Sequence, residues 1–322
     1  MTTTAVRLHD FGRDPADVIR VESVPLPPPA DDELQLEMLA SPINPADLNV
    51  IQGTYGELPD LPATIGNEGC GRVVAIGSQV TDFAPGDLVA TSRPGCWCTH
   101  RNLPAADAVP VPAHADPQQA AMLGVNPPSA YGMLHGFVDL QPGDWIVQNA
   151  ANSGVGRCVI ALAGTLGVKT LNLVRRPELI PELTALGADL VVLEDTDLRK
   201  ENPFGDRPPR LALNAVGGPS ALNLASALAP GGTHVTYGAM SRQPVKIPNG
   251  LLIFKDLNFR GFWLRRWFTD TPAPKQADVF SELASLVADG SLRVPIARTY
   301  PIAEILSALS SNADSGKTIL TP

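Results

Sequence analysis

Hydrophobic and polar residues alternate over short runs in about the first 110 residues of the chain. Glycine and proline separate these runs, of which ELQLEMLA (33–40), GCGRVVAIGS (69–78) and GDLVATS (86–92) are examples. Such alternation between turn residues is typical of β-strands in an all-β module. Residues 118–123 and 129–135 then show a helical pattern, which Pro127-Pro128 should interrupt.

Strand and helix patterns alternate from about residue 143 onward. Buried strands are predicted for DWIVQNA (144–150), KTLNLV (169–174), DLVVLE (189–194), RLALNAV (210–216) and GTHVTYG (232–238). Helical patterns at 154–167, 177–188 and 218–228 separate most of these strands. Strands joined by single helices predict an α/β fold with a doubly wound parallel sheet. About the last 50 residues predict two helices and two strands that return to the N-terminal module.

The chain has 322 residues, enough for about two domains. Its net charge of −9 argues against a nucleic-acid-binding surface, because phosphate binding needs clustered lysine and arginine. The sequence contains no apolar run of 18 residues, and the segment MTTTAVRLHDFGRD lacks an apolar core. These features predict a cytoplasmic protein that has no membrane partner.

The small-residue segment NAANSGVG (149–156) joins the first strand of the alternating region to its helix. In a dinucleotide-binding unit, such a turn directs backbone N–H groups and the helix N-terminus toward the pyrophosphate. The segment departs from the strict GxGxxG pattern, so a packing turn without a ligand is the alternative interpretation. On the first interpretation, its cofactor-binding residues are Asn149, Asn152, Ser153, Gly154, Val155 and Gly156.

Arg175 and Arg176 directly follow the second strand of this region, where no acid is present. An acid at this place accepts a hydrogen bond from the ribose 2′-hydroxyl of NAD, whereas arginine accommodates the 2′-phosphate of NADP. The pair therefore favours NADPH as the cofactor. The alternative is a solvated strand end without a ligand.

Several stretches carry a resemblance to a known family: SPINPADLNVIQGTYG (41–56), GNEGCGRVVAIGSQV (66–80), VNPPSAYGML (125–134), QNAANSGVG (148–156) and GFWLRRW (261–267). In these stretches the chain resembles the medium-chain dehydrogenase/reductase superfamily, and within it the zinc-independent trans-2-enoyl-CoA (2-enoyl thioester) reductase branch. The resemblance implies a GroES-like, β-rich catalytic domain of residues 1–120 and 268–322. It also implies a Rossmann NADP(H)-binding domain of residues 121–267, and a homodimer.

Zinc alcohol dehydrogenases of this superfamily bind their catalytic metal through cysteine and histidine. At the first two ligand positions this chain has Ser41 and Asn67, which are poor zinc ligands. The four cysteines include a CxC pair, Cys96 and Cys98, without a second pair to complete a zinc site. We therefore expect no bound metal.

Reduction of an activated C=C bond needs no Lewis acid. Hydride addition to the β-carbon of an unsaturated thioester places negative charge on the thioester oxygen, and an acid then protonates the α-carbon. The resemblance implies that Tyr55 in IQGTYG is this acid, although Gly56 stands where the family often has proline. A tyrosine that only packs in a loop is the alternative interpretation.

The resemblance implies roles for further residues. Asn44 in INPAD would orient nicotinamide or substrate, and an Asn-Pro turn is the alternative. From their charge, Arg265 and Arg266 would meet the phosphates of CoA or the acidic face of an acyl carrier protein, and a solvated pair is the alternative. The remaining residues expected at the cofactor are Tyr237, Gly238, Ala239, Met240, Phe262, Trp263 and Lys317. A buried aromatic is the alternative for Trp263, and a surface lysine is the alternative for Lys317.

Together these features predict an NADPH-dependent reductase of trans-2-enoyl thioesters carried on CoA or acyl carrier protein. A quinone or small-enone reductase of the same superfamily would share the fold and the cofactor. A protein that binds NADPH as a sensor, without turnover, is the alternative from a different functional class.

Overall fold

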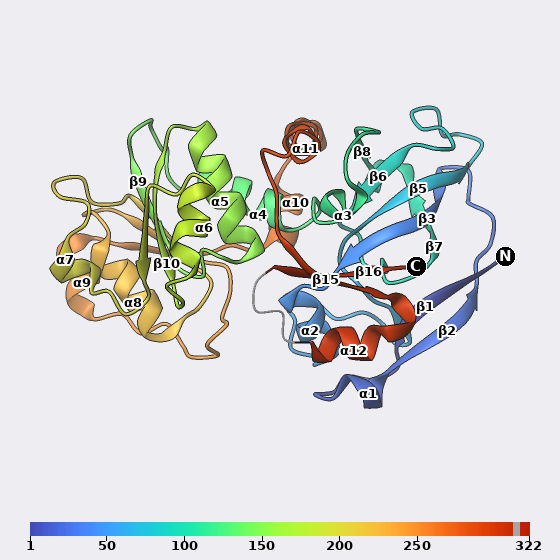
Figure 1. The fold of residues 1–322 in the computed structure, drawn as a ribbon, viewed down its shortest axis with the longest axis horizontal. Helices are drawn as coiled ribbons and strands as arrows, with labels where there is room; N and C mark the ends of the chain where they lie inside the picture. Colours follow the sequence, from blue (N-terminus) through green and yellow to red (C-terminus); the bar gives the residue numbers. More distant parts are fainter. Residues whose placement is uncertain (312–315) are drawn as a thin grey trace. The chain divides into compact units, whose positions relative to one another are not determined.

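The computed structural model describes residues 1–311 and 316–322. The chain forms two compact units, one of residues Met1–Asn126 with Pro274–Pro322 and the other of residues Pro127–Ala273. In Figure 1 the first unit contains the blue and red ends of the chain, and the second contains the green to orange middle. No helix among the described residues has the length and apolarity to cross a bilayer.

The first unit contains two β-sheets. The smaller has the strand order β2-β1-β4, and the larger has the order β15-β16-β3-β5-β6-β8 with β7 paired to β3. Their strands are β1 (Thr2–Leu8), β2 (Ile19–Pro25), β3 (Glu33–Pro42), β4 (Ala63–Thr64), β5 (Gly69–Ile76), β6 (Leu88–Thr91), β7 (His100–Pro104), β8 (Val109–Val111), β15 (Ile296–Pro301) and β16 (Lys317–Thr321). The C-terminal β16 pairs antiparallel with β3, so the end of the chain completes the N-terminal sheet, as the sequence predicts.

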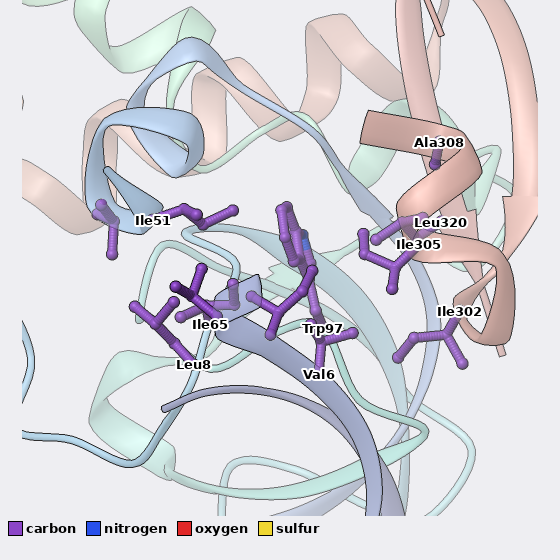
Figure 2. Close-up of a cluster of buried hydrophobic side chains, with 12 residues drawn as sticks. Val6, Leu8, Ile51, Ile65, Trp97, Ile302, Ile305, Ala308 and Leu320 are labelled. Atoms are coloured by element: carbon purple, nitrogen blue, oxygen red, sulfur yellow. The ribbon is translucent and has the colours of Figure 1, made fainter. Parts of the chain in front are cut away.

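Short helices connect these strands: α1 (Pro15–Val18), α2 (Pro45–Ile51), η1 (Ala105–Asp107), α3 (Pro117–Ala120), η2 (Ile302–Glu304) and α12 (Ile305–Ser310). The longer α11 (Ala273–Ala288) leads back into the first unit. A buried cluster joins N- and C-terminal segments, and Figure 2 shows Trp97 between Ile51 of α2 on one side and Ile305 and Leu320 on the other. This packing holds α2 against the sheet through apolar contacts.

The second unit contains a parallel sheet of order β11-β10-β9-β12-β13-β14. Its strands are β9 (Trp145–Gln148), β10 (Lys169–Val174), β11 (Leu190–Leu193), β12 (Leu211–Asn214), β13 (Thr233–Thr236) and β14 (Asn258–Gly261). Strand order reverses direction between β9 and β12, the topological switch point at which doubly wound sheets bind ligands. The predicted doubly wound parallel sheet is therefore confirmed.

Helices cover both faces of this sheet, as a parallel sheet requires. One buried cluster joins α5 (Gly154–Thr165) and α6 (Leu179–Ala185) to one face. A second cluster joins α7 (Leu198–Glu201), α8 (Gly218–Ala227) and α9 (Asn249–Lys255) to the other. Figure 1 shows the two groups of helices on opposite sides of the sheet.

One expected helix boundary is wrong. Pro127 and Pro128 lie in the first turn of α4 (Asn126–Gly136) and do not interrupt a helix. Proline is tolerated in a first turn because the N–H that it lacks has no partner within the helix there. The strand β14 and the short helices α7, α9 and α10 (Leu264–Asp270) are additional to the predicted elements.

Candidate cofactor and catalytic sites

The predicted phosphate-binding turn lies between the carboxyl end of β9 and the N-terminus of α5. Ser153 is the N-cap of α5, and its hydroxyl accepts a hydrogen bond of 3.1 Å from the N–H of Gly156. A Cβ on Gly156 would lie 2.6 Å from the carbonyl oxygen of Ala151, so only glycine fits this close approach. The remaining N–H groups of the first helical turn are available to an anion at this end of the helix.

Hydrogen bonds of the Asn149 side chain connect the carboxyl ends of β9 and β12. Its Nδ2 donates to Oδ1 of Asn214 at 2.8 Å and to Oγ of Ser220 at 2.9 Å, while its Oδ1 accepts from the N–H of Ala215 at 2.7 Å. The Asn149 side chain is fully buried. It supports the edge of the sheet, and direct contact of this residue with the cofactor stays a prediction.

Arg157 is a supporting residue that the sequence analysis did not identify. It is only 3 % exposed, its Nε donates to the carbonyl of Asn152 at 3.1 Å, and its Nη2 lies 2.6 Å from Oε1 of Glu182. It thereby connects the turn before α5 to helix α6. An arginine within the otherwise apolar helical run GVGRCVIALAG was the available sequence signal.

Arg175 and Arg176 lie at the carboxyl end of β10, the strand next to β9. Arg175 is exposed, and Nε of Arg176 is 3.6 Å from Oε1 of Glu178. Solvated guanidinium groups beside a phosphate-binding turn are suited to a second phosphate, because arginine presents several N–H donors to its oxygens.

A cavity of about 550 Å³ opens at the carboxyl ends of β11 and β12. It is lined by Asp195 and Asp197 after β11, and by Gly217, Ser241 and Gln243 on the other side. This volume lies in the range of small-molecule sites. The turn lies at the switch point between β9 and β12, and the arginine pair follows the neighbouring strand β10 at the same edge of the sheet, an arrangement that suits a dinucleotide with an additional phosphate.

The segment Tyr237–Met240 follows β13 at the same edge. The Tyr237 phenol is buried, which raises its pKa, and the adjacent Ser153 hydroxyl lowers that pKa by less. A Cβ on Gly238 would be 2.8 Å from the carbonyl oxygen of Ala215, so this segment lies tightly against the end of β12. The structure therefore brings Tyr237 together with the N-cap of α5, while Met240 is 55 % exposed.

Phe262 and Trp263 follow β14, the last strand of the sheet. The Phe262 ring packs on α4, where a Cβ on Gly132 would meet its Cε2 at 2.8 Å. Trp263 is the N-cap of α10 and is 39 % exposed. Of these two residues, Trp263 is the one whose side chain is open to a ligand.

Tyr55 lies in the first unit, in the loop after α2. The carbonyl of Asn49 in α2 accepts backbone N–H groups from Thr54 at 2.9 Å and Tyr55 at 3.2 Å, which fixes the loop to the end of the helix. The ring is half-buried against the apolar cluster of Figure 2. The backbone of Tyr55 is thus positioned by α2.

Asn44 and Lys317, both expected near the cofactor, are joined to each other by a hydrogen bond from Nζ of Lys317 to Oδ1 of Asn44. The Nδ2 of Asn44 also donates to Oε1 of Glu68 at 2.8 Å. Its backbone N–H donates to Oδ2 of Asp47 at 2.7 Å. These three partners of Asn44 are all ionisable residues, so Asn44 is the centre of a buried polar network.

The two acids of this network are fully buried. Burial raises the pKa of Glu68 to about 7, and the nearby Lys317 is the largest opposing influence. Burial likewise raises the pKa of Asp47 to about 6, opposed first by its hydrogen bonds with the backbones of Asn44 and Asn67. Neither acid was predicted from the sequence, although the motifs NPAD and GNEG place them among small and turn-forming residues.

The positions at which zinc dehydrogenases have ligands are occupied here by hydrogen-bonded neutral side chains. Oγ of Ser41 donates to the carbonyl of Cys96 at 2.8 Å, and Nδ2 of Asn67 donates to Oδ1 of Asp47 at 2.8 Å. The described part of the chain contains no group of three His, Cys, Asp or Glu residues arranged to hold a metal ion. This donor set does not fit a zinc ion.

Comparison with known proteins agrees with the two units. Residues 30–138 match the family Alcohol dehydrogenase GroES-like domain, and residues 154–283 match the family Zinc-binding dehydrogenase. The chain is 46 % identical over 320 residues to the mitochondrial enoyl-[acyl-carrier-protein] reductase of Homo sapiens, covering 96 % of this chain and 86 % of the relative. The protein of that name from Rattus norvegicus is also 46 % identical, over 321 residues.

Two solved structures are similar to this chain over nearly its whole length. A complex of Etr1p with NADP and crotonyl-CoA superposes with a TM-score of 0.89 at 30 % identity over the whole of both chains. Escherichia coli quinone oxidoreductase in complex with NADPH gives a TM-score of 0.87 at 26 % identity, covering 99 % of this chain and all of the other.

The relatives contradict the expected cytoplasmic location, because those from human, rat and cattle are all named as mitochondrial. That expectation rested on the absence of an apolar N-terminal core. Such an absence does not specify a compartment, since mitochondrial targeting segments are amphipathic.

Two family matches along the chain, 46 % identity to enoyl reductases and the superposition on Etr1p agree with the sheet topology and with the polar residues at the zinc-ligand positions. The chain therefore belongs to the medium-chain dehydrogenase/reductase superfamily, in its 2-enoyl thioester reductase branch.

Proposed function

We propose that this protein reduces the C=C bond of trans-2-enoyl thioesters with NADPH and without zinc. One observation carries this proposal: the loop of Tyr55 is fixed to α2 in a unit whose zinc-ligand positions hold hydrogen-bonded Ser41 and Asn67. We assign to the Tyr55 phenol the role of the acid, in a reaction that needs no metal. The relatives named as enoyl-[acyl-carrier-protein] reductases support this substrate class.

NADPH, when bound, supplies a hydride to the β-carbon of the substrate. Tyr55 would donate a hydrogen bond to the thioester oxygen as the π electrons move onto it, and would then deliver a proton to the α-carbon. Asn44 would orient the reacting groups from the N-terminus of α2. Both roles are assigned to residues that the helix holds at its two ends.

The second unit would bind the cofactor. The turn of residues 149–156 would hold the pyrophosphate at the N-terminus of α5, and Arg175 with Arg176 would hold the 2′-phosphate. The segment Tyr237–Met240, Phe262 and Trp263 would border the nicotinamide. In domain terms, we assign catalysis to residues 1–120 and 268–322 and cofactor binding to residues 121–267, near the bounds of the compact units.

The acyl carrier would be CoA or acyl carrier protein. Arg265 and Arg266 are exposed on α10, and Arg266 pairs with Asp270 at 3.3 Å. Exposed arginines of this kind suit the phosphates of CoA and the acidic surface of a carrier protein.

A homodimer is the proposed assembly. Strand β14 is at the edge of its sheet, and α9 presents the exposed side chains of Leu252, Ile253 and Phe254, the last of them 85 % exposed. An open strand edge beside exposed apolar residues favours association with a second copy. Light scattering of the wild type and of Phe254→Glu tests this, with a monomeric wild type as the contradicting result.

The experiment that tests the catalytic proposal is NADPH oxidation with crotonyl-CoA and with a longer 2-enoyl-CoA, for the wild type and Tyr55→Phe. We expect turnover by the wild type and a loss on the order of 10²-fold or more in the variant, because an acid–base group is removed. No turnover of either thioester, with NADPH still bound, would exclude this function.

A quinone or small-enone reductase is the second candidate, and the likeness to Escherichia coli quinone oxidoreductase favours it. The same assay separates the two candidates. Reduction of a free quinone at a rate well above that of crotonyl-CoA, without dependence on Tyr55, would support the second.

A further inference from the structure

Glu68 lies immediately before β5 and is fully buried. Its Oε1 accepts the hydrogen bond of 2.8 Å from Nδ2 of Asn44. Asn44 is itself only 3 % exposed and is the N-cap of α2. The Glu68 carboxylate is therefore hydrogen-bonded directly to the N-cap residue of α2.

Helix α2 is short and is held at both ends. At its start, Asp47 accepts from the backbone N–H of Asn44 at 2.7 Å and from the N–H of Asn67 at 2.9 Å, which ties the helix to the turn before Glu68. At its end, the Asn49 carbonyl receives the N–H groups of Thr54 and Tyr55. A displacement at the Asn44 end is thus transmitted to the Tyr55 loop through about two turns of helix.

Both side-chain ends of Asn44 are engaged by charged groups of opposite sign. Lys317 donates to Oδ1, and Glu68 accepts from Nδ2. An amide whose oxygen faces a cation and whose nitrogen faces an anion is fixed in one of its two flipped orientations. Loss of either partner would leave that orientation undetermined.

We propose that Glu68 is a positioning residue for the reduction step, acting through Asn44 and α2 on the placement of Tyr55. This inference rests on the proposed function, because it assigns Glu68 to the acid that the reduction requires. A misplacement of about 1 Å at a reacting group can cost on the order of 10²-fold in rate, so a buried hydrogen bond of this kind has a measurable effect.

A matched pair of variants at position 68 separates the effect of side-chain length from the effect of charge. Glu68→Gln keeps the length of the side chain and an acceptor oxygen for Asn44 but removes the charge. Glu68→Asp keeps the charge but is one methylene shorter, so its carboxylate no longer reaches Asn44. We expect kcat within about threefold of the wild type for Glu68→Gln and a loss of about 10-fold or more for Glu68→Asp.

The deciding measurement is a double-mutant cycle with Tyr55→Phe. If Glu68 acts through Tyr55, then Glu68→Asp lowers kcat by less than about threefold in the Tyr55→Phe background, because the group that it positions is already absent. The same fold loss in both backgrounds would overturn the proposal, as would a Glu68→Gln variant no faster than Glu68→Asp.

Gln119→Ala is the control for a general loss of buried polar contacts in the same unit. The Gln119 side chain is buried and exchanges hydrogen bonds of 3.0 and 3.1 Å with the backbone of Val294. It should lower the melting temperature without changing kcat in either background. A wild type that fails to reduce crotonyl-CoA would refute the proposed function, whereas an active wild type with an additive cycle would refute this inference alone.

Discussion

Lys317 donates a hydrogen bond to the side-chain oxygen of Asn44, although 273 residues separate the two positions. The contact arises because β16 pairs with β3, which brings the end of the chain beside the segment that leads into α2. The positive charge of Lys317 lowers the pKa values of Glu68 and Asp47, whereas the larger effect of burial raises them. Lys317, which was expected at the cofactor, thus belongs to the polar network at the start of α2.

Replacing Lys317 by methionine removes the cation that compensates two buried acids. We expect the free energy of unfolding to fall by about 3 kcal/mol at pH 8, since two buried acids lose the nearby cation that stabilises their charged forms. The loss should be smaller at pH 5.5, where protonated acids need no counter-charge. Urea unfolding at both pH values measures it, and the exposed Lys200→Met is the control, with little effect expected.

Glu68→Gln should change how stability depends on pH. The folded protein raises the pKa of Glu68 from 4.5 to about 7, so it binds this proton more tightly than the unfolded chain does. The buried carboxylate therefore costs stability above pH 7, and this cost disappears as the pH falls from 7 toward 4.5. Relative to the wild type, the variant should gain up to about 3 kcal/mol above pH 7 and lose that advantage near pH 4.5. A difference that is constant across this range would contradict the assignment.

Arg157→Gln should weaken NADPH binding indirectly, through the turn before α5 that Arg157 supports. The substitution removes the support of the Asn152 carbonyl and the ion pair with Glu182. We expect a rise of about 10-fold in the dissociation constant, corresponding to about 1.4 kcal/mol, from titration of NADPH fluorescence. Glu182→Gln keeps the Arg157–Asn152 contact and should have a smaller effect. Equal effects of the two variants would show that the ion pair with Glu182, and not the hydrogen bond to Asn152, stabilises the turn.

Arg175→Ala should lower kcat/KM for NADPH by about 10-fold to 10²-fold and leave that for NADH nearly unchanged. The reason is the loss of charge-assisted hydrogen bonds to the 2′-phosphate, a group that NADH lacks. Arg176→Ala should have the smaller effect, because its guanidinium is already close to Glu178. An equal loss with both cofactors would show that Arg175 does not select between them.

The double variant Arg265→Glu/Arg266→Glu tests the carrier. If α10 meets an acidic carrier protein, kcat/KM for a crotonyl carrier protein should fall by at least about 10-fold at low salt and the difference should shrink at high salt. Crotonyl-CoA would lose less, since it presents a smaller charged surface. Arg207→Glu, at an exposed position of the second unit, serves as the matched control.

Local signals were sufficient for the parallel sheet and for the turn between β9 and α5. The alternation of strand and helix predicts the parallel sheet, and the small residues of NAANSGVG predict a tight turn between strand and helix, because both patterns involve residues a few positions apart. The exact course of α4 through Pro127 and Pro128 was missed, since proline interrupts a helix interior but not its first turn. The compartment was also predicted wrongly, because composition does not encode it.

The sequence by itself determined the two-part architecture, the glycine turn and the arginine pair, all of which follow from short-range patterns. Only the tertiary structure decided that Asn44, Glu68 and Lys317 meet, because this requires β16 to pair with β3 across nearly the whole chain. Burial likewise raises the pKa values of Glu68 and Asp47, and burial depends on what every other segment places around them. The glycine turn and the arginine pair can be read locally, whereas the buried acids around Asn44, with their charge and orientation, are properties of the assembled core.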